Sequence, residues 1–253
     1  MENFTRFEAV PASEILSWAV ETFGTGFAIA TSFQKEGMVI VDLAARISPA
    51  VRVFTLDTGR LPEETYGMME TVYQRYGIRV EAVAPDAEEV GQLVSIQGPN
   101  LFYSGVAERQ RCCEIRKVRP LERKLATLQA WATGLRREQA ETRAGVAKVE
   151  RGGAGRIKIA PLADWSSAMV DEYTADNGVP VHPLYARGYA SIGCAPCTRA
   201  IEPGESERAG RWWWEQDAKK ECGIHFSPDG KVTRAPSAPE STTTSETESQ
   251  PNA

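Results

Sequence analysis

Histidine and cysteine are scarce in this sequence, and long apolar runs are missing. Its 253 residues include two histidines and five cysteines. No stretch approaches the roughly 18 apolar residues of a transmembrane helix, so we expect no membrane span. The opening MENFTRFEAVPASE lacks the apolar core of a signal peptide, which favours a cytoplasmic protein. In a cytoplasmic protein, an odd number of cysteines argues against a disulfide framework and favours metal binding or catalysis.

An overall excess of positive charge is also missing. The formal net charge is -5, so the charge of the whole chain predicts no nucleic-acid partner. One segment departs from this balance: residues 108–124, ERQRCCEIRKVRPLERK, carry seven Lys or Arg against three Glu, a net +4. A basic run is ordinarily a solvated helix face, but this one contains two cysteines, which favours an anion site.

Strand and helix patterns alternate along most of the chain. We predict strands within residues 26–33, 51–59, 78–85 and 130–135, and helices within 11–24, 38–47, 62–77 and 112–125. This alternation predicts an α/β fold with a mostly parallel sheet flanked by helices. Beyond residue 178, Gly, Pro and Tyr dominate and predict a loop-rich C-terminal segment. We expect one domain over residues 1–226 and a disordered tail over 227–253, which has almost no apolar side chains.

Three segments that follow predicted strands are candidates for binding a nucleotide. Residues 31–37, TSFQKEG, precede a helix, where backbone amides and the Ser32 hydroxyl can hold a phosphate or sulfate. The Walker spacing is missing there. Asp57 of LDTG can orient a ribose or cap the next helix, and both roles stay open. In TGLRREQAETR, the paired donors of Arg136, Arg137 and Arg143 suit oxyanions.

Four of the cysteines form two pairs. Cys112 and Cys113 are adjacent, whereas Cys194 and Cys197 form a CxxC motif. Four thiolates suit a zinc ion or an iron–sulfur cluster. Adjacent cysteines approach a single tetrahedral ion poorly, while a cubane offers separate irons, so the pattern favours a cluster. Two unrelated buried cysteine pairs remain the alternative.

Five motifs together resemble the assimilatory adenylyl-sulfate reductases, the cluster-containing branch of the phosphoadenylyl/adenylyl-sulfate reductase family. They are RCCEIRKVRPL, TGLRREQ, SIGCAPCTRAI, GRWWWE and KKECGIH, and the resemblance covers about Phe23 to His225. It implies an adenine nucleotide α-hydrolase-like fold, with residues 1–226 as the reductase domain. It also implies reduction of adenylyl sulfate to sulfite and AMP through a cysteine S-sulfonate, with one 4Fe–4S cluster and thioredoxin or a glutaredoxin-like protein as thiol donor.

The resemblance also assigns roles to individual residues. The cluster ligands would be Cys112, Cys113, Cys194 and Cys197, and the nucleophile would be Cys222. The catalytic cations would be Lys117, Arg208 and Arg211, with His225 completing the C-terminal motif. Nucleotide-holding segments would contain Ser32, Phe33, Asp57 and Gly134, to which the oxyanion chemistry adds Arg136 as a candidate contact.

The segment KKECGIH suits a reactive thiol. A free cysteine has a pKa of about 8.5 and is mostly protonated at neutral pH. Lys219, Lys220 and His225 would lower the pKa of Cys222 and so favour the thiolate. His225 lies three positions after Cys222, so in a helix or turn the two side chains can meet, and His225 can contact Cys222 or a phosphate. A purely structural role for His225 stays open. We hypothesise that this thiol covers the bound nucleotide and then swings out to meet its reductant.

Three other functions are alternatives to this interpretation. The same fold could use phosphoadenylyl sulfate, which carries an additional ribose phosphate. An ATP-using adenylating enzyme of the superfamily would need a Ser-Gly-Gly-x-Asp-Ser loop, which TSFQKEG does not match. A non-catalytic, metal-stapled nucleotide-binding module would leave Cys222 without a chemical role.

Overall fold

A six-stranded sheet forms the centre of the protein. The computed structural model describes residues 4–140, 143–215, 225–226 and 232–233. The strand order is β3-β2-β1-β4-β6-β5. The strands are β1 (Phe27–Ala30), β2 (Val53–Leu56), β3 (Glu81–Val83), β4 (Ala130–Ala132), β5 (Val149–Arg151) and β6 (Ile157–Ile159). All neighbours pair in parallel except β5, which lies antiparallel to β6 at the edge. The predicted fold class is confirmed.

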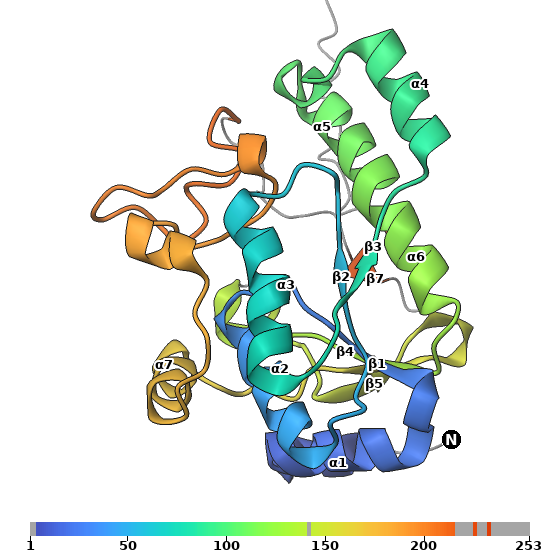
Figure 1. Ribbon diagram of the computed structural model, residues 1–253, viewed down its shortest axis with the longest axis vertical. Coiled ribbons are helices and arrows are strands. Elements are labelled where there is room, and N and C mark those ends of the chain that lie inside the picture. The colour runs from blue at the N-terminus through green and yellow to red at the C-terminus, as the bar shows by residue number, and fades with distance from the viewer. Residues whose placement is uncertain (1–3, 141–142, 216–224, 227–231, 234–253) are drawn as a thin grey trace, which may run out of the picture.

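Helices cover both faces of this sheet (Figure 1). They are α1 (Ala12–Phe23), α2 (Lys35–Ile47), α3 (Glu63–Tyr76), α4 (Ala87–Gln97), α5 (Val106–Cys113), α6 (Arg119–Leu125) and α7 (Ser167–Asp176). The side chains of β4 alternate between two cores: Ala130 and Ala132 pack with α1, α2, α3 and α7, whereas Trp131 packs with α6. Burial on both faces explains why the central strands β1 and β4 are apolar at every position.

Local sequence fixes several of these boundaries. Helix α3 follows Pro62 and ends at Gly77, whose φ of 71° lies in the left-handed region that glycine favours. Helix α4 was not predicted, because only Leu93 of its residues is fully buried and its apolar periodicity is weak. Its start is nevertheless encoded, since the Asp86 carboxylate accepts hydrogen bonds from the amides of Glu88 and Glu89, both at 3.0 Å.

The predicted helix over residues 112–125 belongs to a longer helical rod. It begins at Val106 in α5, passes through a π-helical turn at Glu114–Val118 and continues as α6 (Figure 1). Such π turns are rare and often occur at functional sites. This one directly follows Cys112 and Cys113, so a local change in helical pitch lies beside the cysteine pair.

The C-terminal part is loop-rich, as predicted. After α7 the described chain contains short 3-10 turns, among them Pro183–Arg187 and Ala195–Cys197. The short strands β7 (His225–Phe226) and β8 (Val232–Thr233) pair antiparallel. Apart from Val232 and Thr233, the predicted tail lies outside the described residues. In the part of the chain that is described, none of the helices has the length and apolar character needed to cross a membrane.

The strand order reverses beside β1, and this positions the site. From β1 the chain moves outward to β2 and β3 and then returns to β4 on the other side of β1. Ligands of open parallel sheets bind at such switch points, at the carboxyl ends of the strands. The loops that follow β1 and β4 touch there: a Cβ on Gly134 would lie 2.8 Å from the Cβ of Glu36 and 3.1 Å from the amide nitrogen of Gly37.

This contact predicts opposite effects for two glycine-to-alanine substitutions. Gly134→Ala should lower the free energy of unfolding by about 1–3 kcal/mol, because the added methyl overpacks the switch point. Gly67→Ala is the matched control, since its Cβ in α3 would meet no heavy atom within 4 Å. Gly67→Ala should raise the free energy of unfolding by roughly 0.5–1 kcal/mol, because alanine gives the unfolded chain less conformational entropy than glycine does. Thermal denaturation of both variants measures this, and an equal or higher melting temperature for Gly134→Ala would contradict the close packing.

Candidate active site

A cavity of about 980 Å³ opens at the carboxyl ends of the central strands. Its walls come from segments far apart in the sequence: the loops after β1 and β4, the helical rod and the C-terminal loops. Of the predicted site residues, those on its surface are Ser32, Cys112, Cys113, Lys117, Gly134, Arg136, Arg143, Cys194, Cys197, Arg208 and Arg211. The fold therefore gathers most of the described candidates around one space.

The turn between β1 and α2 supplies a helix N-terminus to this cavity. Ser32 lies on the cavity surface, and its hydroxyl accepts a hydrogen bond from Gln34 Nε2 at 3.0 Å. Phe33 has a φ of 57°, and its amide donates to Thr31 Oγ1 at 3.0 Å. Its side chain is fully buried in the core and is not part of the cavity surface. Phe33 shapes the turn, therefore, while Ser32 faces the space where a ligand can bind.

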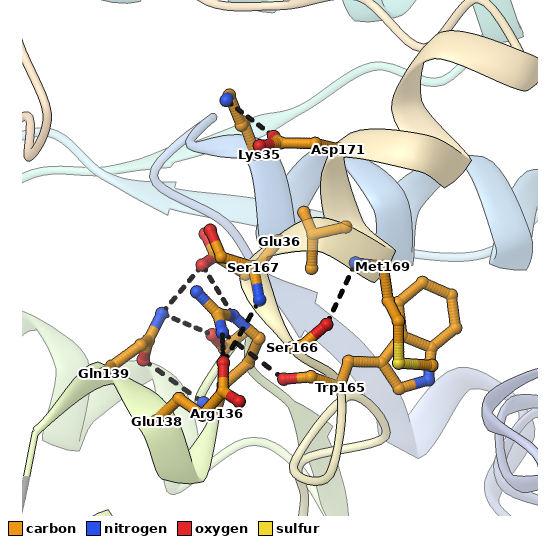
Figure 2. Close-up of polar contacts among 12 residues, drawn as sticks. Lys35, Glu36, Arg136, Glu138, Gln139, Trp165, Ser166, Ser167, Met169 and Asp171 are labelled. Atoms are coloured by element: carbon orange, nitrogen blue, oxygen red, sulfur yellow. Dashed lines mark hydrogen bonds and ion pairs between the residues drawn. The ribbon is translucent and has the colours of Figure 1, made fainter.

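Arg136 joins the two loops at the switch point (Figure 2). Its Nε atom donates to Glu36 Oε1 at 2.9 Å, and its Nη1 atom donates to the carbonyl oxygen of Trp165 at 3.3 Å. Gln139 Nε2 also donates to Glu36 Oε1, at 2.9 Å. The Arg136 side chain is only 4 % exposed. These contacts give Arg136 a structural use, and its role as a nucleotide contact stays a prediction.

Asp57 organises the turn after β2. Its Oδ1 atom accepts hydrogen bonds from the Gly59 amide and from the Tyr66 hydroxyl, both at 2.8 Å. Burial, followed by this bond to Asp57, raises the pKa of Tyr66 to about 12. Asp57 is not the N-cap of α3, a position held by Pro62, and it is not on the cavity surface. Its proposed contact with a ribose stays a prediction.

The four paired cysteines line the same cavity. Cys112 and Cys113 end α5, while Cys194 and Cys197 lie at the Ala195–Cys197 turn. Cys112 and Cys197 are buried in an apolar cluster with Phe102, Ile115 and Trp212, and Cys194 packs against it. Burial raises the pKa of the Cys197 thiol, and the neighbouring Cys194 and Cys113 raise it further. The two sequence pairs are thus close enough to interact electrostatically.

Two further details describe the surroundings of these thiols. Thr58 Oγ1 lies 3.1 Å from Cys194 Sγ and forms a hydrogen bond with it. Burial also raises the pKa of Cys112, although the positive charge of Arg116 opposes this effect. Within the described ranges, no three His, Cys, Asp or Glu side chains are grouped so that they could hold a metal ion.

Buried arginines form the cationic side of the cavity. Arg211 is 6 % exposed, and its guanidinium group packs so closely on Gly193 that a Cβ there would lie 2.3 Å from Nη2. Its Nη1 donates to Ser191 Oγ at 3.4 Å, whereas its buried Nε has no hydrogen-bond partner. Arg116 likewise has an unpaired buried Nε, although its Nη1 donates to the Thr58 carbonyl at 2.8 Å. Both arginines line the cavity, where charge-assisted hydrogen bonds from a guanidinium group to an oxyanion are favourable.

Sequence reasoning overlooked Arg109 and Arg116 on the cavity surface. Both belong to the basic run that the sequence singled out, so their charge was visible. Their burial, at 3 % and 9 % exposure, depends on contacts with distant segments and gave no local signal. Cys222 lies outside the described residues, as does the side chain of His225, so their roles stay predictions.

Comparisons with known proteins agree with this geometry. Residues 26–200 match the family model described as the phosphoadenosine phosphosulfate reductase domain. The chain is 49% identical over 213 residues to the adenosine 5'-phosphosulfate reductase of Allochromatium vinosum, covering 83% of this chain and 81% of that protein. It is 45% identical over 230 residues to 5'-adenylylsulfate reductase 3, chloroplastic, of Arabidopsis thaliana, covering 87% of this chain and 50% of the plant protein.

A solved structure shares the fold. The phosphoadenylyl-sulfate reductase of Candida auris, in a phosphate complex, aligns with a TM-score of 0.64 at 28% sequence identity, over 76% of this chain and 91% of that one. The FMN adenylyltransferase of Candida glabrata aligns with a TM-score of 0.52 at 12% identity, over 77% and 66%, which shows the fold alone. The family match spans all six strands of the central sheet and the CxxC turn, and this chain belongs to the phosphoadenosine phosphosulfate reductase family.

Proposed function

We propose that this protein reduces adenylyl sulfate to sulfite and AMP, as part of assimilatory sulfate reduction, with a thioredoxin-class protein as thiol donor. The observation that carries the proposal is the composition of the cavity at the switch point. This cavity is lined by the loop that begins α2, by four cysteines and by buried arginines. The names of the relatives support the same substrate. The reducing thiols that the reaction consumes favour the cytoplasm as its location.

The cavity suits a substrate with an adenosine end and an anionic end. The loops after β1 and β4 offer backbone amides and Ser32 at a helix N-terminus, which favours phosphate binding. Lys117, Arg208 and Arg211 on the same cavity surface would neutralise the phosphosulfate. We expect the guanidinium group of Arg211 to donate to one of its oxygens.

Cys222 would begin the reaction as a thiolate. Its sulfur attacks the sulfur of the sulfonate group, forming an S–S bond, while the S–O bond to AMP breaks and its electron pair leaves with AMP. The product is a cysteine S-sulfonate. The cations that bind the substrate lower the charge repulsion between the thiolate and the anionic substrate.

A dithiol protein would complete the cycle. One of its thiolates attacks the Cys222 sulfur, which releases sulfite with the electron pair of the S–S bond and leaves a mixed disulfide. Its second thiol then frees Cys222 and closes the disulfide of the reductant. The dithiol is oxidised by two electrons and the sulfonate sulfur is reduced by two, so thiols supply all the electrons.

We also propose that Cys112, Cys113, Cys194 and Cys197 hold one 4Fe–4S cluster. Among the described residues these thiols are not grouped closely enough to hold a single metal ion, but all four line one cavity, and a cubane offers each of them a separate iron, so the donor set fits a cluster. When bound, the cluster would link the helical rod to the CxxC turn and adjust the electrostatic field around Lys117. Residues 1–226 would form a single reductase domain around this site.

Replacing the sulfur atom of Cys222 with oxygen tests whether this residue is the nucleophile. Cys222→Ser replaces the thiol with a much weaker nucleophile, so sulfite formation from adenylyl sulfate should fall at least about a thousandfold. AMP affinity should stay unchanged, because the variant keeps the cavity. Sulfite release in the presence of thioredoxin and AMP titration measure the two properties. Sulfite formation near the unmodified rate would exclude the enzyme proposed here.

The proposed cluster ligands can be tested by iron content, with a substitution of Cys222, which lies outside the two pairs, as the control. After anaerobic purification, the unmodified protein and Cys222→Ser should both contain about four irons per chain and absorb visible light. Cys194→Ser should lose most of this iron, because one ligand is missing. Iron analysis and absorption spectra give the answer. Equal iron in Cys194→Ser and Cys222→Ser would show that the cysteine pairs are not the ligands.

A further inference from the structure

A buried ion pair joins the helical rod to the last residues described before Cys222. Arg109 Nε donates to Glu215 Oε1 at 2.6 Å, and Arg109 Nη2 donates to Glu215 Oε2 at 3.1 Å. The two side chains are only 4 % and 3 % exposed. Two parallel hydrogen bonds between planar groups fix both distance and orientation. This pair therefore sets where residue 215 lies relative to α5.

The position of the pair connects it to the cysteines on one side. Arg109 lies on α5 three residues before Cys112, so the two side chains lie on neighbouring parts of one helix face. The guanidinium group of Arg109 lies over the ring of Trp212, 4.4 Å from its centroid. The Trp212 amide donates to the carbonyl oxygen of Cys197 at 3.1 Å. The pair thus begins on the helix that carries one cysteine pair and is linked through Trp212 to the turn that carries the other.

The pair also lies close in the sequence to the proposed nucleophile. Glu215 precedes Cys222 by seven positions in the sequence. Its amide donates to the Trp212 carbonyl at 2.9 Å, so a tight turn connects the stacked tryptophan to the paired glutamate. Trp212 itself has a φ of 43°, which is unfavourable for a residue other than glycine and needs firm surroundings. The chain is thus anchored immediately before the segment that carries Cys222.

Stability alone does not explain such a pair. Removing two charges from water is costly, and replacing a buried ion pair with apolar residues of similar volume is often neutral or stabilising. What the charged pair adds is a defined geometry. Attack on a bound sulfonate depends on placement, and an error of about 1 Å can slow a reaction about a hundredfold.

We propose that Arg109 and Glu215 are positioning residues that hold the start of the C-terminal segment in the place from which Cys222 reaches the substrate. This inference rests on the proposed function, since it assumes that Cys222 accepts the sulfonate group. Neither side chain needs to touch the reacting atoms. Their effect is on the rate of S-sulfonation, with the binding of the nucleotide unchanged.

Replacing the ion pair with two apolar side chains separates its effect on the position of the segment from its effect on protein stability. Arg109→Met with Glu215→Met should keep the melting temperature, the iron content and the AMP affinity of the unmodified protein, because methionine fills the space without buried charge. The rate constant for S-sulfonation of Cys222 in a single turnover should fall at least about tenfold. Quenched-flow mass spectrometry measures this rate.

Two comparisons complete the experiment. The control combines Lys124→Met with Glu81→Gln, which removes the ion pair of a buried lysine on the same helical rod and should leave the rate unchanged. Glu215→Gln keeps the shape and one acceptor oxygen, so its rate should lie between those of the double variant and the unmodified protein.

The outcomes distinguish failure of the positioning role from failure of the proposed function. A rate within about twofold of normal in both the double variant and Glu215→Gln would overturn the positioning role while leaving the proposed function intact. If the double variant lost its iron or its fold, Glu215→Gln alone would decide. Absence of S-sulfonation in the unmodified protein would overturn both the proposed function and the inference that rests on it.

Discussion

The reversal of strand order beside β1 is the constraint on which the site depends. Because β2 and β4 lie on opposite sides of β1, the loops that leave β1 and β4 meet above the sheet. Their contact is tight enough to need glycine at position 134, and the ion pair between Arg136 and Glu36 holds them together. Everything else in the cavity, including the helical rod and the CxxC turn, is arranged around this junction.

The basic run shows how folding redistributes charge. In the sequence, residues 108–124 have a net charge of +4. In the structure three of these charges are held in ion pairs: Arg109 binds Glu215, Arg119 binds Glu89 and Lys124 binds Glu81. Arg109 also lines the cavity, together with Arg116 and Lys117 of the π-helical turn. The change in helical pitch thus coincides with the part of the run that is turned toward the ligand space.

Much of this arrangement could be predicted from local sequence, and the remainder could not. The central strands and their helices carry strong periodicity, and the cysteine pairs have distinctive spacing. Strand β5 reads Val-Glu-Arg and has one buried apolar residue, Val149, so it carries no apolar alternation to detect. The engagement of Arg136 by Glu36 and the pairing of Arg109 with Glu215 join residues 100 and 106 positions apart. Such contacts follow from the topology, which no local pattern encodes.

The central claim is that Cys222 takes the sulfonate group from an adenine nucleotide held in this cavity. It is tested most directly by mixing the purified protein with adenylyl sulfate in the absence of any reductant, followed by peptide mass spectrometry. We predict one SO3 group on Cys222 and one AMP released per chain. AMP and sulfite released with no sulfonate on Cys222, or a sulfonate on another cysteine, would contradict the account.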